Sequence, residues 1–389
     1  MGESRKFTVG ILGTGTIFTA YARGLSGIPE LPVVRVADLD QDRARAAAEQ
    51  WSIPAWGTTE ELLADDSLDI VVNITPPGAH APLTDAALRA GKHVYTEKPL
   101  AATVELARRN IATAAETGRV LGGAPDTFLG AAGQTARAAV DEGLIGRPFA
   151  ATSFVRSSKA QSWHPEPSFL FQPGGGPVLD WGPYHLAALV NLLGPVTEVM
   201  GAGTRAEDRI AVTAPDRRVE HVDVEVPTHV TSVLRFASGA LATTMYSFDV
   251  WDTGVPHIEV YGTEGTLQLP DPNQFDLPVR IRRRGEDAWR DLDPVIPPTA
   301  PPPGTPFRAL GVADLARHLD GGPHRASADF AFHVLEVLER IEAATPESGT
   351  AAVTSTTERP APVRGGVSAS VRADVPDPVR GEAPAPVRE

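Results

Sequence analysis

Short apolar runs alternate with helical patterns along the first 124 residues of the chain. Apolar and β-branched runs at 7–12, 32–37, 68–75 and 93–96 predict strands. The run at 68–75, LDIVVNIT, is apolar almost throughout, which is typical of a strand that is buried on both faces. The segments of helical pattern between these runs are 17–27, 41–51, 81–90 and 104–117, and a shorter segment at 59–64 precedes the third run. This alternation predicts right-handed βαβ units and a doubly wound parallel sheet, that is, an α/β fold.

The pattern changes after residue 125. Apolar and polar positions alternate from 219 to 269, with turns at Ser238-Gly239 and Glu264-Gly265. Such alternation predicts an open, mostly antiparallel sheet with one face solvated or covered by a partner. Helical patterns occur at 129–142, 184–193, 308–319 and 330–344. We therefore expect a C-terminal α+β domain over residues 125–344, after an N-terminal domain over residues 1–124.

Two further segments carry no periodic pattern. Residues 294–306, PVIPPTAPPPGTP, lack too many backbone donors to form a helix or a ladder, so we expect an extended connector. Residues 345–389 are rich in Pro, Ala, Val, Arg, Glu, Ser and Gly without any period. We expect this stretch to be a disordered tail without a chemical role.

Composition excludes several classes of partner. The net charge of −14 argues against a nucleic-acid or anionic-membrane surface. The chain has no cysteine, which excludes disulfides and thiolate metal sites, and we expect no metal site. It has no apolar run long enough to span a membrane, and its N-terminus enters an apolar strand without a signal-peptide pattern. These features predict a cytoplasmic protein.

A glycine turn, Gly13-Thr14-Gly15-Thr16-Ile17, joins the first strand to the first helix. Glycines are needed where a chain turns tightly and a phosphate approaches the N–H groups at a helix N-terminus. Gly13, Gly15, Thr16 and Ile17 are therefore candidate cofactor-binding residues of a dinucleotide-binding (Rossmann) domain. A complete fingerprint would have a third small residue at position 18, where this chain has Phe18.

Asp38 closes the second strand about 20 residues after the glycines, where an acid accepts hydrogen bonds from the adenosine ribose. Its charge, with Asp40 beside it, predicts NAD in preference to NADP. Arg43, one turn into the next helix, keeps NADP open because a 2′-phosphate could pair with it.

Thr75, Pro76 and His80 follow the fourth strand at its carboxyl end. Ligands of open α/β sheets bind at such ends, so these residues are candidates for the nicotinamide half of the site. His80 could equally be a residue of the helix N-terminus that contacts no ligand.

Lysine is rare in this chain. Of 35 Lys plus Arg residues only Lys6, Lys92, Lys98 and Lys159 are lysine. A lysine ammonium can take part in proton chemistry, whereas arginine does not change its protonation state. Pro99 disfavours a helical conformation at Lys98, so the side chain of Lys98 can project from a strand end into the crevice above the sheet.

Five elements together resemble a known family: GTGTI at 13–17, Asp38, TPPGAH at 75–80, EKP at 97–99 and GGGPVLDWGPYH at 174–185. They are similar to the Gfo/Idh/MocA family of NAD(P)-dependent oxidoreductases, named for glucose-fructose oxidoreductase, inositol dehydrogenase and a rhizopine-catabolism protein. The resemblance runs in order from about residue 7 to residue 340.

The resemblance implies roles for the site residues. Lys98 would hydrogen-bond the reacting hydroxyl and also lie on the cofactor side of the site, and the positive ring of the oxidised cofactor would help to lower its pKa. Glu97, in the same cofactor-side motif, would anchor the turn. Asp180 would orient the substrate, although it could also be a plain helix N-cap. We expect catalysis to involve Lys98 and Asp180 together with an acid/base residue.

The identity of that acid/base residue is open. Family members commonly read Asp-x-Gly-x-His, and some branches have tyrosine in place of the histidine. Here Tyr184 stands four residues after Asp180, on the same side of a helix, and His185 is turned aside by about 100°. A phenol needs a nearby cation such as Lys98 to act as a base at neutral pH, and an imidazole does not. We expect Tyr184 to move the proton, with His185 as the second candidate.

Trp163 and His164 stand on a loop that could reach the same crevice, where they could contact a sugar ring and a hydroxyl. The leading hypothesis is an NAD-dependent dehydrogenase that acts on a secondary alcohol of a sugar, cyclitol or related polyol. One alternative is glycoside cleavage by transient oxidation and elimination with a tightly held NAD. Another is a non-catalytic regulator that senses sugar or nucleotide on the same fold. We also expect a homo-oligomer, a dimer or tetramer, because the open sheet needs cover for an apolar face.

Overall fold

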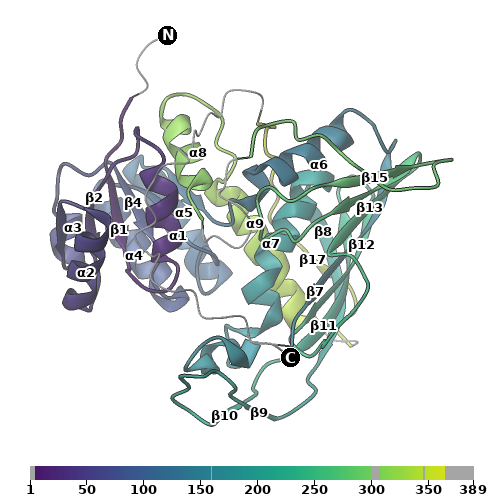
Figure 1. The fold of residues 1–389 in the computed structure, drawn as a ribbon, viewed down its shortest axis with the longest axis horizontal. Helices are drawn as coiled ribbons and strands as arrows, with labels where there is room; N and C mark the ends of the chain where they lie inside the picture. Colours follow the sequence, from purple (N-terminus) through teal and green to yellow (C-terminus); the bar gives the residue numbers. More distant parts are fainter. Residues whose placement is uncertain (1–4, 159, 299–306, 345–346, 364–389) are drawn as a thin grey trace.

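The computed structural model describes residues 5–158, 160–298, 307–344 and 347–363. Its N-terminal half is a six-stranded parallel sheet in the order β3-β2-β1-β4-β5-β6 (Figure 1). The strands are β1 (Val9–Leu12), β2 (Val33–Ala37), β3 (Ala55–Gly57), β4 (Ile70–Asn73), β5 (His93–Thr96) and β6 (Leu121–Gly123). The helices are α1 (Phe18–Ser26), α2 (Gln41–Trp51), α3 (Thr59–Leu63), α4 (Pro77–Arg89) and α5 (Val104–Thr117). The predicted doubly wound sheet is confirmed.

The strand order places the binding crevice of this half. Strands β1 and β4 are neighbours, but the chain leaves them toward opposite edges of the sheet. Every residue of both strands is buried, which explains their apolar sequences. Ligands of open α/β sheets bind outside the carboxyl ends of strands at such a reversal. We therefore expect the ligand of this half to bind above Leu12 and Asn73.

The second half contains a nine-stranded sheet in the order β16-β15-β14-β13-β7-β12-β11-β8-β17. Its neighbouring strands run antiparallel except β7 and β12, which are parallel, so the predicted open, mostly antiparallel sheet is confirmed. The strands are β7 (Pro148–Arg156), β8 (Val196–Thr204), β11 (His229–Phe236), β12 (Leu241–Ser247), β13 (Ile258–Gly262), β14 (Gly265–Leu269), β15 (Arg280–Arg283), β16 (Arg290–Asp291) and β17 (Ala351–Ala352).

The alternating run that begins at residue 219 divides between two sheets. Its first part forms β10 (His221–Asp223), which pairs with β9 (Arg209–Ala211) in a separate two-stranded sheet. Pro227 interrupts the run before β11. The two-stranded sheet and the short helices η2 (Ala160–Ser162) and η3 (Pro167–Leu170) share a small core, and we call this part of the molecule the small lobe.

Helices cover one face of the large sheet. In Figure 1, α6 (Ala131–Asp141), α7 (Gly176–Leu193) and α9 (Ala328–Ala343) lie between the parallel sheet and the large sheet. The large sheet forms the outer side of the molecule. Helix α7 is longer than the 184–193 that the pattern predicts. Sixteen of its residues are buried, and this packing overrides the helix-breaking tendency of Gly182 and Pro183. In the described part of the chain, no helix is long and apolar enough to cross a membrane.

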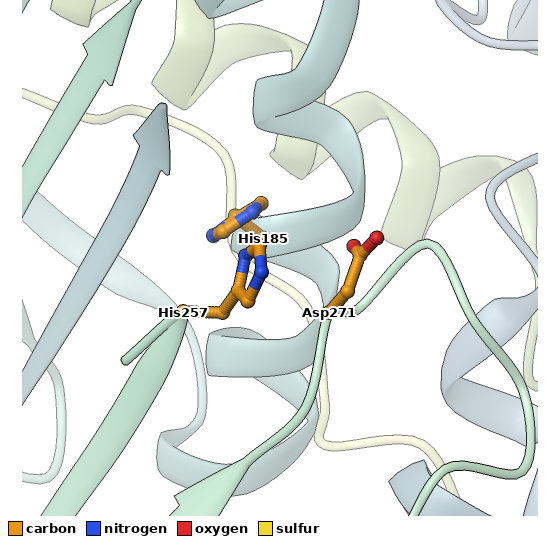
Figure 2. A group of neighbouring side chains, drawn as sticks. All are labelled: His185, His257 and Asp271. Carbon is orange, nitrogen blue, oxygen red and sulfur yellow. The ribbon is translucent and has the colours of Figure 1, made fainter. Parts of the chain in front are cut away.

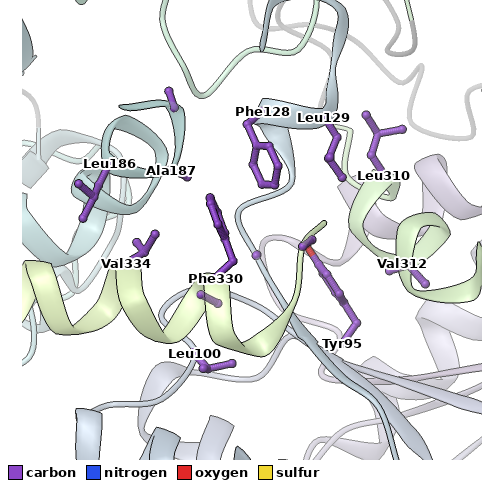
Figure 3. Close-up of a cluster of buried hydrophobic side chains, with 14 of the residues drawn as sticks. Tyr95, Leu100, Phe128, Leu129, Leu186, Ala187, Leu310, Val312, Phe330 and Val334 are labelled. Atoms are coloured by element: carbon purple, nitrogen blue, oxygen red, sulfur yellow. The ribbon is translucent and has the colours of Figure 1, made fainter. Parts of the chain in front are cut away.

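The chain returns to the first sheet near its C-terminal end. Helices α8 (Leu310–Leu319) and α9 follow the connector, and the N–H of Gly123 in β6 donates to the carbonyl of Ala326 at 3.0 Å. Figure 3 shows side chains of both halves in one cluster, among them Tyr95, Phe128 and Phe330. The hydrophobic core is therefore continuous across the two halves.

The expectation of disorder from residue 345 onward is wrong for residues 347–363. Strand β17 pairs with the edge of β8, and Val363 is 8% exposed. The buried carboxylate of Glu336 accepts hydrogen bonds from the backbone N–H groups of Thr354 and Ser355 at 3.0 and 2.7 Å. These partners satisfy the backbone of a segment that has no apolar period of its own. Residues 345–346 and 364–389, the rest of the predicted tail, lie outside the described residues, as do 299–306 of the connector.

Candidate active site

The glycine turn lies at the predicted place, between β1 and α1. Gly13 has a positive φ of 98°, and a Cβ there would stand 3.0 Å from the carbonyl oxygen of Ile74. Gly15 and Thr16 are exposed, and an added Cβ at Gly15 would meet no atom within 4 Å. Ile17 packs against the core, and Phe18 is buried. Phe18 thus stands where a complete fingerprint has a small residue, and its side chain belongs to the hydrophobic core.

The carboxylate of Asp38 faces the glycine turn. Its Oδ2 accepts hydrogen bonds from the N–H and hydroxyl of Thr14 at 2.7 and 2.8 Å. Its Oδ1 accepts from the guanidinium of Arg43 at 2.6 Å and from the N–H of Asp40 at 3.0 Å. Burial would raise the pKa of Asp38, but these donors, Arg43 first among them, lower it to about 2.

Arg43 is thus a direct neighbour of Asp38, and its positive charge weakens the electrostatic reason to expect NAD in preference to NADP. Its side chain is 52% exposed at the point where a ribose would meet the carboxylate. The expected negative charge of Asp38 is partly neutralised there. Even so, the exposed glycine turn, the start of α1 and an acid at the end of β2 fit the phosphates and ribose of a nicotinamide dinucleotide.

The residues after β4 divide into an exposed and a buried part. Pro76 is exposed, and the hydroxyl of the half-buried Thr75 donates to Asn73 Oδ1 at 2.7 Å. His80 is 1% exposed, with Nδ1 2.7 Å from the carbonyl oxygen of Pro99 and Nε2 2.7 Å from that of Thr75. Burial is the main cause that lowers the pKa of His80. Both ring nitrogens face backbone carbonyl oxygens, and a neutral imidazole can donate its one N–H to either of them. This buried position against the backbone favours a bracing role for His80 over ligand contact.

Hydrogen bonds of Glu97 fix the Glu97-Lys98-Pro99 turn. The hydroxyl of Tyr21 in α1 donates to Glu97 Oε1 at 2.9 Å, and the N–H of Lys98 donates to Glu97 Oε2 at 2.7 Å. The N–H of Glu97 donates to the carbonyl of Asn73 at the end of β4. Glu97 therefore fixes the backbone from which Lys98 projects, as an anchor of the turn would do.

Lys98 and Asp180 connect the two halves of the molecule. Lys98 Nζ donates to Asp180 Oδ1 at 3.0 Å and to the backbone carbonyl of Asp180 at 2.6 Å. The side chains are 17% and 26% exposed. Burial alone would lower the pKa of Lys98, but the carboxylate of Asp180 outweighs it and the pKa is raised. Without a cofactor, Lys98 is therefore a persistent cation. The family resemblance implies instead a lowered pKa of Lys98 beside the positive ring of the oxidised cofactor.

Helix α7 presents Asp180 and Tyr184 to this lysine. Asp180 is the fifth residue of α7, not its N-cap, because the helix begins at Gly176. Lys98 Nζ lies 5.3 Å from the ring centroid of Tyr184, and the phenol is 8% exposed. The spacing of four thus brings both side chains to Lys98, as the sequence predicts.

Arg308 is a second cation beside Tyr184. Its guanidinium carbon lies 5.6 Å from the centroid of the Tyr184 ring. Burial would lower the pKa of Arg308, but Tyr184, Asp126 and Glu97 outweigh burial and raise it. Asp126 is fully buried, which raises its pKa, and its Oδ2 accepts from the N–H of Gly311 at 3.0 Å. No local signal marked Arg308, because it reaches the site only through the return of the chain after the connector.

His185 points away from this site. Its imidazole is 1% exposed, and Nδ1 lies 2.8 Å from the hydroxyl of Ser153 in β7. The ring stands 6.0 Å from that of His257, and burial lowers the pKa of His185 well below its ordinary value. Of the two acid/base candidates, Tyr184 is therefore the one beside Lys98, and His185 faces the large sheet.

Trp163 and His164 lie in the small lobe. Trp163 is 53% exposed and makes edge contacts with the rings of His164 and Phe169. His164 Nδ1 is 2.7 Å from the carbonyl of Glu166, so one ring nitrogen is engaged by its own loop. Trp181, next to Asp180, packs against the small-lobe core. The lobe thus adjoins α7 beside the lysine, although no described contact joins Trp163 to Lys98.

Comparison with known proteins finds two family models that match this chain in order. Residues 7–123 match the model described as "Oxidoreductase family, NAD-binding Rossmann fold", and residues 134–268 match the GFO/IDH/MocA C-terminal domain. A dTDP-3,4-didehydro-2,6-dideoxy-alpha-D-glucose 3-reductase from Streptomyces antibioticus is 30% identical over 87% of this chain and 97% of its own length. A 1,5-anhydro-D-fructose reductase from Ensifer adhaerens is 33% identical over 66% of this chain and 74% of its own length.

Solved structures share the fold. A levoglucosan dehydrogenase in complex with NADH and levoglucosan superposes with a TM-score of 0.77 at 20% identity, over 90% of this chain and 100% of that one. An NAD-binding oxidoreductase from Klebsiella pneumoniae gives a TM-score of 0.76 at 24% identity, over 90% and 99% of the two chains. With both domain models matched in order and a relative that aligns over almost its whole length, the chain belongs to the Gfo/Idh/MocA family of NAD-binding oxidoreductases.

Proposed function

We propose that the chain transfers hydride between a nicotinamide dinucleotide, NAD in preference to NADP, and a secondary alcohol of a sugar, cyclitol or related polyol. The observation that carries this proposal is the group of Lys98, Asp180 and Tyr184 beside the crevice of the first sheet. An ammonium and a phenol face the same space, and both can hydrogen-bond an alcohol oxygen there. A pure binding module has no need of that pairing.

Lys98 orients and polarises the substrate hydroxyl. An ammonium has three N–H donors, and Asp180 accepts from Lys98 Nζ with a carboxylate and a carbonyl oxygen. The remaining N–H is available to the substrate oxygen. Because the pKa of Lys98 is raised, its ammonium keeps its proton and stabilises the negative charge that develops on this oxygen during oxidation.

Tyr184 moves the hydroxyl proton in this proposal. When bound, the nicotinamide accepts or returns the hydride, and the protein supplies orientation and charge around that exchange. Lys98 and Arg308 are cations that lie beside the phenol ring. Asp180 keeps Lys98 in place, and Glu97 fixes the turn beneath it.

Cofactor preference rests on Asp38 and Arg43. The carboxylate of Asp38 can accept hydrogen bonds from ribose hydroxyls and repels a 2′-phosphate, which favours NAD. Arg43 reduces that repulsion. The names of relatives include both an NADP(+)-linked D-xylose 1-dehydrogenase and an NAD(+)-linked scyllo-inositol 2-dehydrogenase, so both cofactors belong in the test.

The substrate class follows from the relatives and from the small lobe. Similar proteins include a 1,5-anhydro-D-fructose reductase and a myo-inositol 2-dehydrogenase, whose names point to ring compounds with several hydroxyls. Trp163 is a half-exposed flat face that could stack on such a ring. His164, beside it, offers a nitrogen to a hydroxyl.

We also propose a homo-oligomer that covers the outer face of the large sheet. Met200 pairs with Val233 across β8 and β11, and Met245 pairs with Phe154 across β12 and β7, with Leu241 on the same face. Met200 and Leu241 are 45% and 39% exposed. Such an apolar stripe is typical of an interface, and a second copy of the sheet would cover it. A strictly monomeric sedimentation profile would contradict this part of the proposal.

The proposed activity is tested by a thermal-shift panel of sugars and cyclitols with NAD or NADP present, followed by absorbance of the reduced cofactor for each hit. We expect a free polyol to yield net reduced cofactor, and Lys98→Met to abolish it. Cleavage of a glycoside without net reduced cofactor would favour transient oxidation and elimination. Full activity of Lys98→Met on every hit would overturn the proposal.

A further inference from the structure

We propose that His185, His257 and Asp271 bind a divalent transition-metal ion of the zinc class on the side of α7 that faces the large sheet. Figure 2 shows the three side chains converging from three parts of the chain. His185 belongs to α7, His257 immediately precedes β13, and Asp271 follows β14. Sequence analysis predicted no metal site, because these residues are far apart along the chain and no spacing motif joins them.

The distances fit a site that closes around an ion. Each residue offers one ligand atom, and these atoms all lie within 4.8 Å of one another. Ligand atoms of a tetrahedral zinc ion, at about 2.0–2.1 Å from the metal, stand about 3.4 Å apart. Small side-chain rotations of His257 and Asp271, which are only partly buried, would bring the three atoms to that separation.

Both imidazoles have a ring nitrogen that could bind a metal. His257 Nδ1 is buried and has no hydrogen-bond partner among the described residues, a costly state for a polar atom. His185 Nδ1 lies 2.8 Å from the hydroxyl of Ser153. Donation of that N–H to the hydroxyl of Ser153 would leave the lone pair on Nε2, and a hydrogen bond of this kind orients a histidine that binds a metal through its other ring nitrogen.

The ligand types favour a transition metal. A histidine binds a metal through the lone pair of a neutral ring nitrogen. Asp271 supplies the negative charge. Two nitrogens and one oxygen suit zinc, nickel or cobalt, whereas magnesium and calcium prefer oxygen ligands throughout.

A metal at this place would stabilise the fold and fix the position of α7. It would tie α7 to the ends of β13 and β14, on the opposite side of the helix from Lys98. Tyr184 precedes His185 directly, so the ion would fix the part of α7 that carries the phenol. The ion itself would not touch substrate, because the helix separates it from the lysine.

The test uses the full chain without a histidine tag, first stripped with a chelator and then titrated with Zn²⁺ or Co²⁺. We expect one equivalent to bind and Co²⁺ to give visible absorption bands of a low-coordinate site. At a hundredfold excess over Kd, Zn²⁺ should raise Tm by about 3 °C.

The variants His257→Ala and Asp271→Asn should each weaken Co²⁺ binding at least tenfold. His229→Ala, on the same sheet, should not, because His229 lies outside the group of His185, His257 and Asp271. Circular dichroism and NAD binding establish that each variant is folded. Absence of Co²⁺ bands in the parent chain, or the same bands in His257→Ala, would overturn the proposal. Neither result depends on the dehydrogenase activity.

Discussion

The coupling between Lys98 and Asp180 can be measured without knowledge of the substrate. Asp180→Asn removes the carboxylate charge, keeps the side-chain shape and leaves the backbone carbonyl that accepts from Lys98 Nζ at 2.6 Å. Lys98→Met removes the ammonium and keeps most of the apolar stem. With the double variant, the two form a cycle that isolates the interaction free energy of the pair.

The structure sets the expected magnitude. At the Nζ–Oδ1 distance of 3.0 Å, a Coulomb energy of about 5.5 kcal/mol applies at an effective dielectric constant near 20. Burial of the ammonium opposes the pair, and both side chains retain contact with solvent. The net coupling should therefore be about 2 kcal/mol, in the range of hydrogen bonds to charged groups.

Chemical unfolding of the parent, the two single variants and the double variant at neutral pH gives the coupling. The decrease in the free energy of unfolding in the double variant should be about 2 kcal/mol smaller than the sum of the decreases in the single variants. Because the pKa of Lys98 is raised in the folded state, the contribution is complete below about pH 10 and declines as the pH rises through the folded pKa. In Asp180→Asn this dependence on alkaline pH should largely disappear.

A matched control is the exposed pair of Arg109 and Glu105, whose atoms lie 3.1 Å apart on α5 with side chains 69% and 65% exposed. The same cycle there, with Arg109→Met and Glu105→Gln, should give less than about 0.5 kcal/mol. A Lys98–Asp180 coupling no larger than that of the control would refute the assignment of a buried, charge-assisted link between the two halves.

Three further predictions concern the cofactor, the proton and the C-terminal segment. Asp38→Ser should shift preference from NAD toward NADP by about tenfold or more, since removal of a charged partner is worth at least about 1.4 kcal/mol; an unchanged ratio of kcat/KM for the two cofactors contradicts the ribose contact. Tyr184→Phe should lower kcat about 100-fold or more, as loss of an acid/base group does; nearly full turnover in Tyr184→Phe with loss in His185→Ala would reverse the assignment. Glu336→Gln should lower the free energy of unfolding at pH 7 by roughly 2 kcal/mol, less than the full pKa shift implies because the amide oxygen of glutamine can still accept a hydrogen bond. Since the pKa of Glu336 is lowered from 4.5 to about 2, the difference between parent and variant should close as the pH falls from 4.5 to 2, and a constant difference over that range would contradict the role of this carboxylate.

Local patterns were sufficient for the first half of the chain and for part of the site. Local sequence predicts the buried strands β1 and β4 and the glycine turn, because neighbours close along the chain determine their residue types. The spacing of Asp180 and Tyr184 likewise predicted that both would reach Lys98. The parallel pairing of β7 with β12 had no such signal, since it depends on how distant strands meet.

Long-range contacts account for what the sequence did not predict. Arg308 reaches Tyr184 only because α8 folds back on the first sheet, and nothing in its own neighbourhood marks it. The order of residues 347–363 depends on Glu336 and the free edge of β8, neither of which is near in sequence. His80 resembled a ligand because of its place after β4, but its two carbonyl partners become visible only in three dimensions.

The return of the chain onto its own beginning has a consequence for dissection and engineering. Gly24 in α1 leaves no room for a side chain, since a Cβ there would come within 2.2 Å of the carbonyl oxygen of Arg308, whose N–H donates to Ala20 at 3.0 Å. A fragment that stops at residue 124 would expose the surface that α8 and α9 occupy. A transplant of the nucleotide-binding module into another scaffold would therefore have to carry residues 307–344 with it.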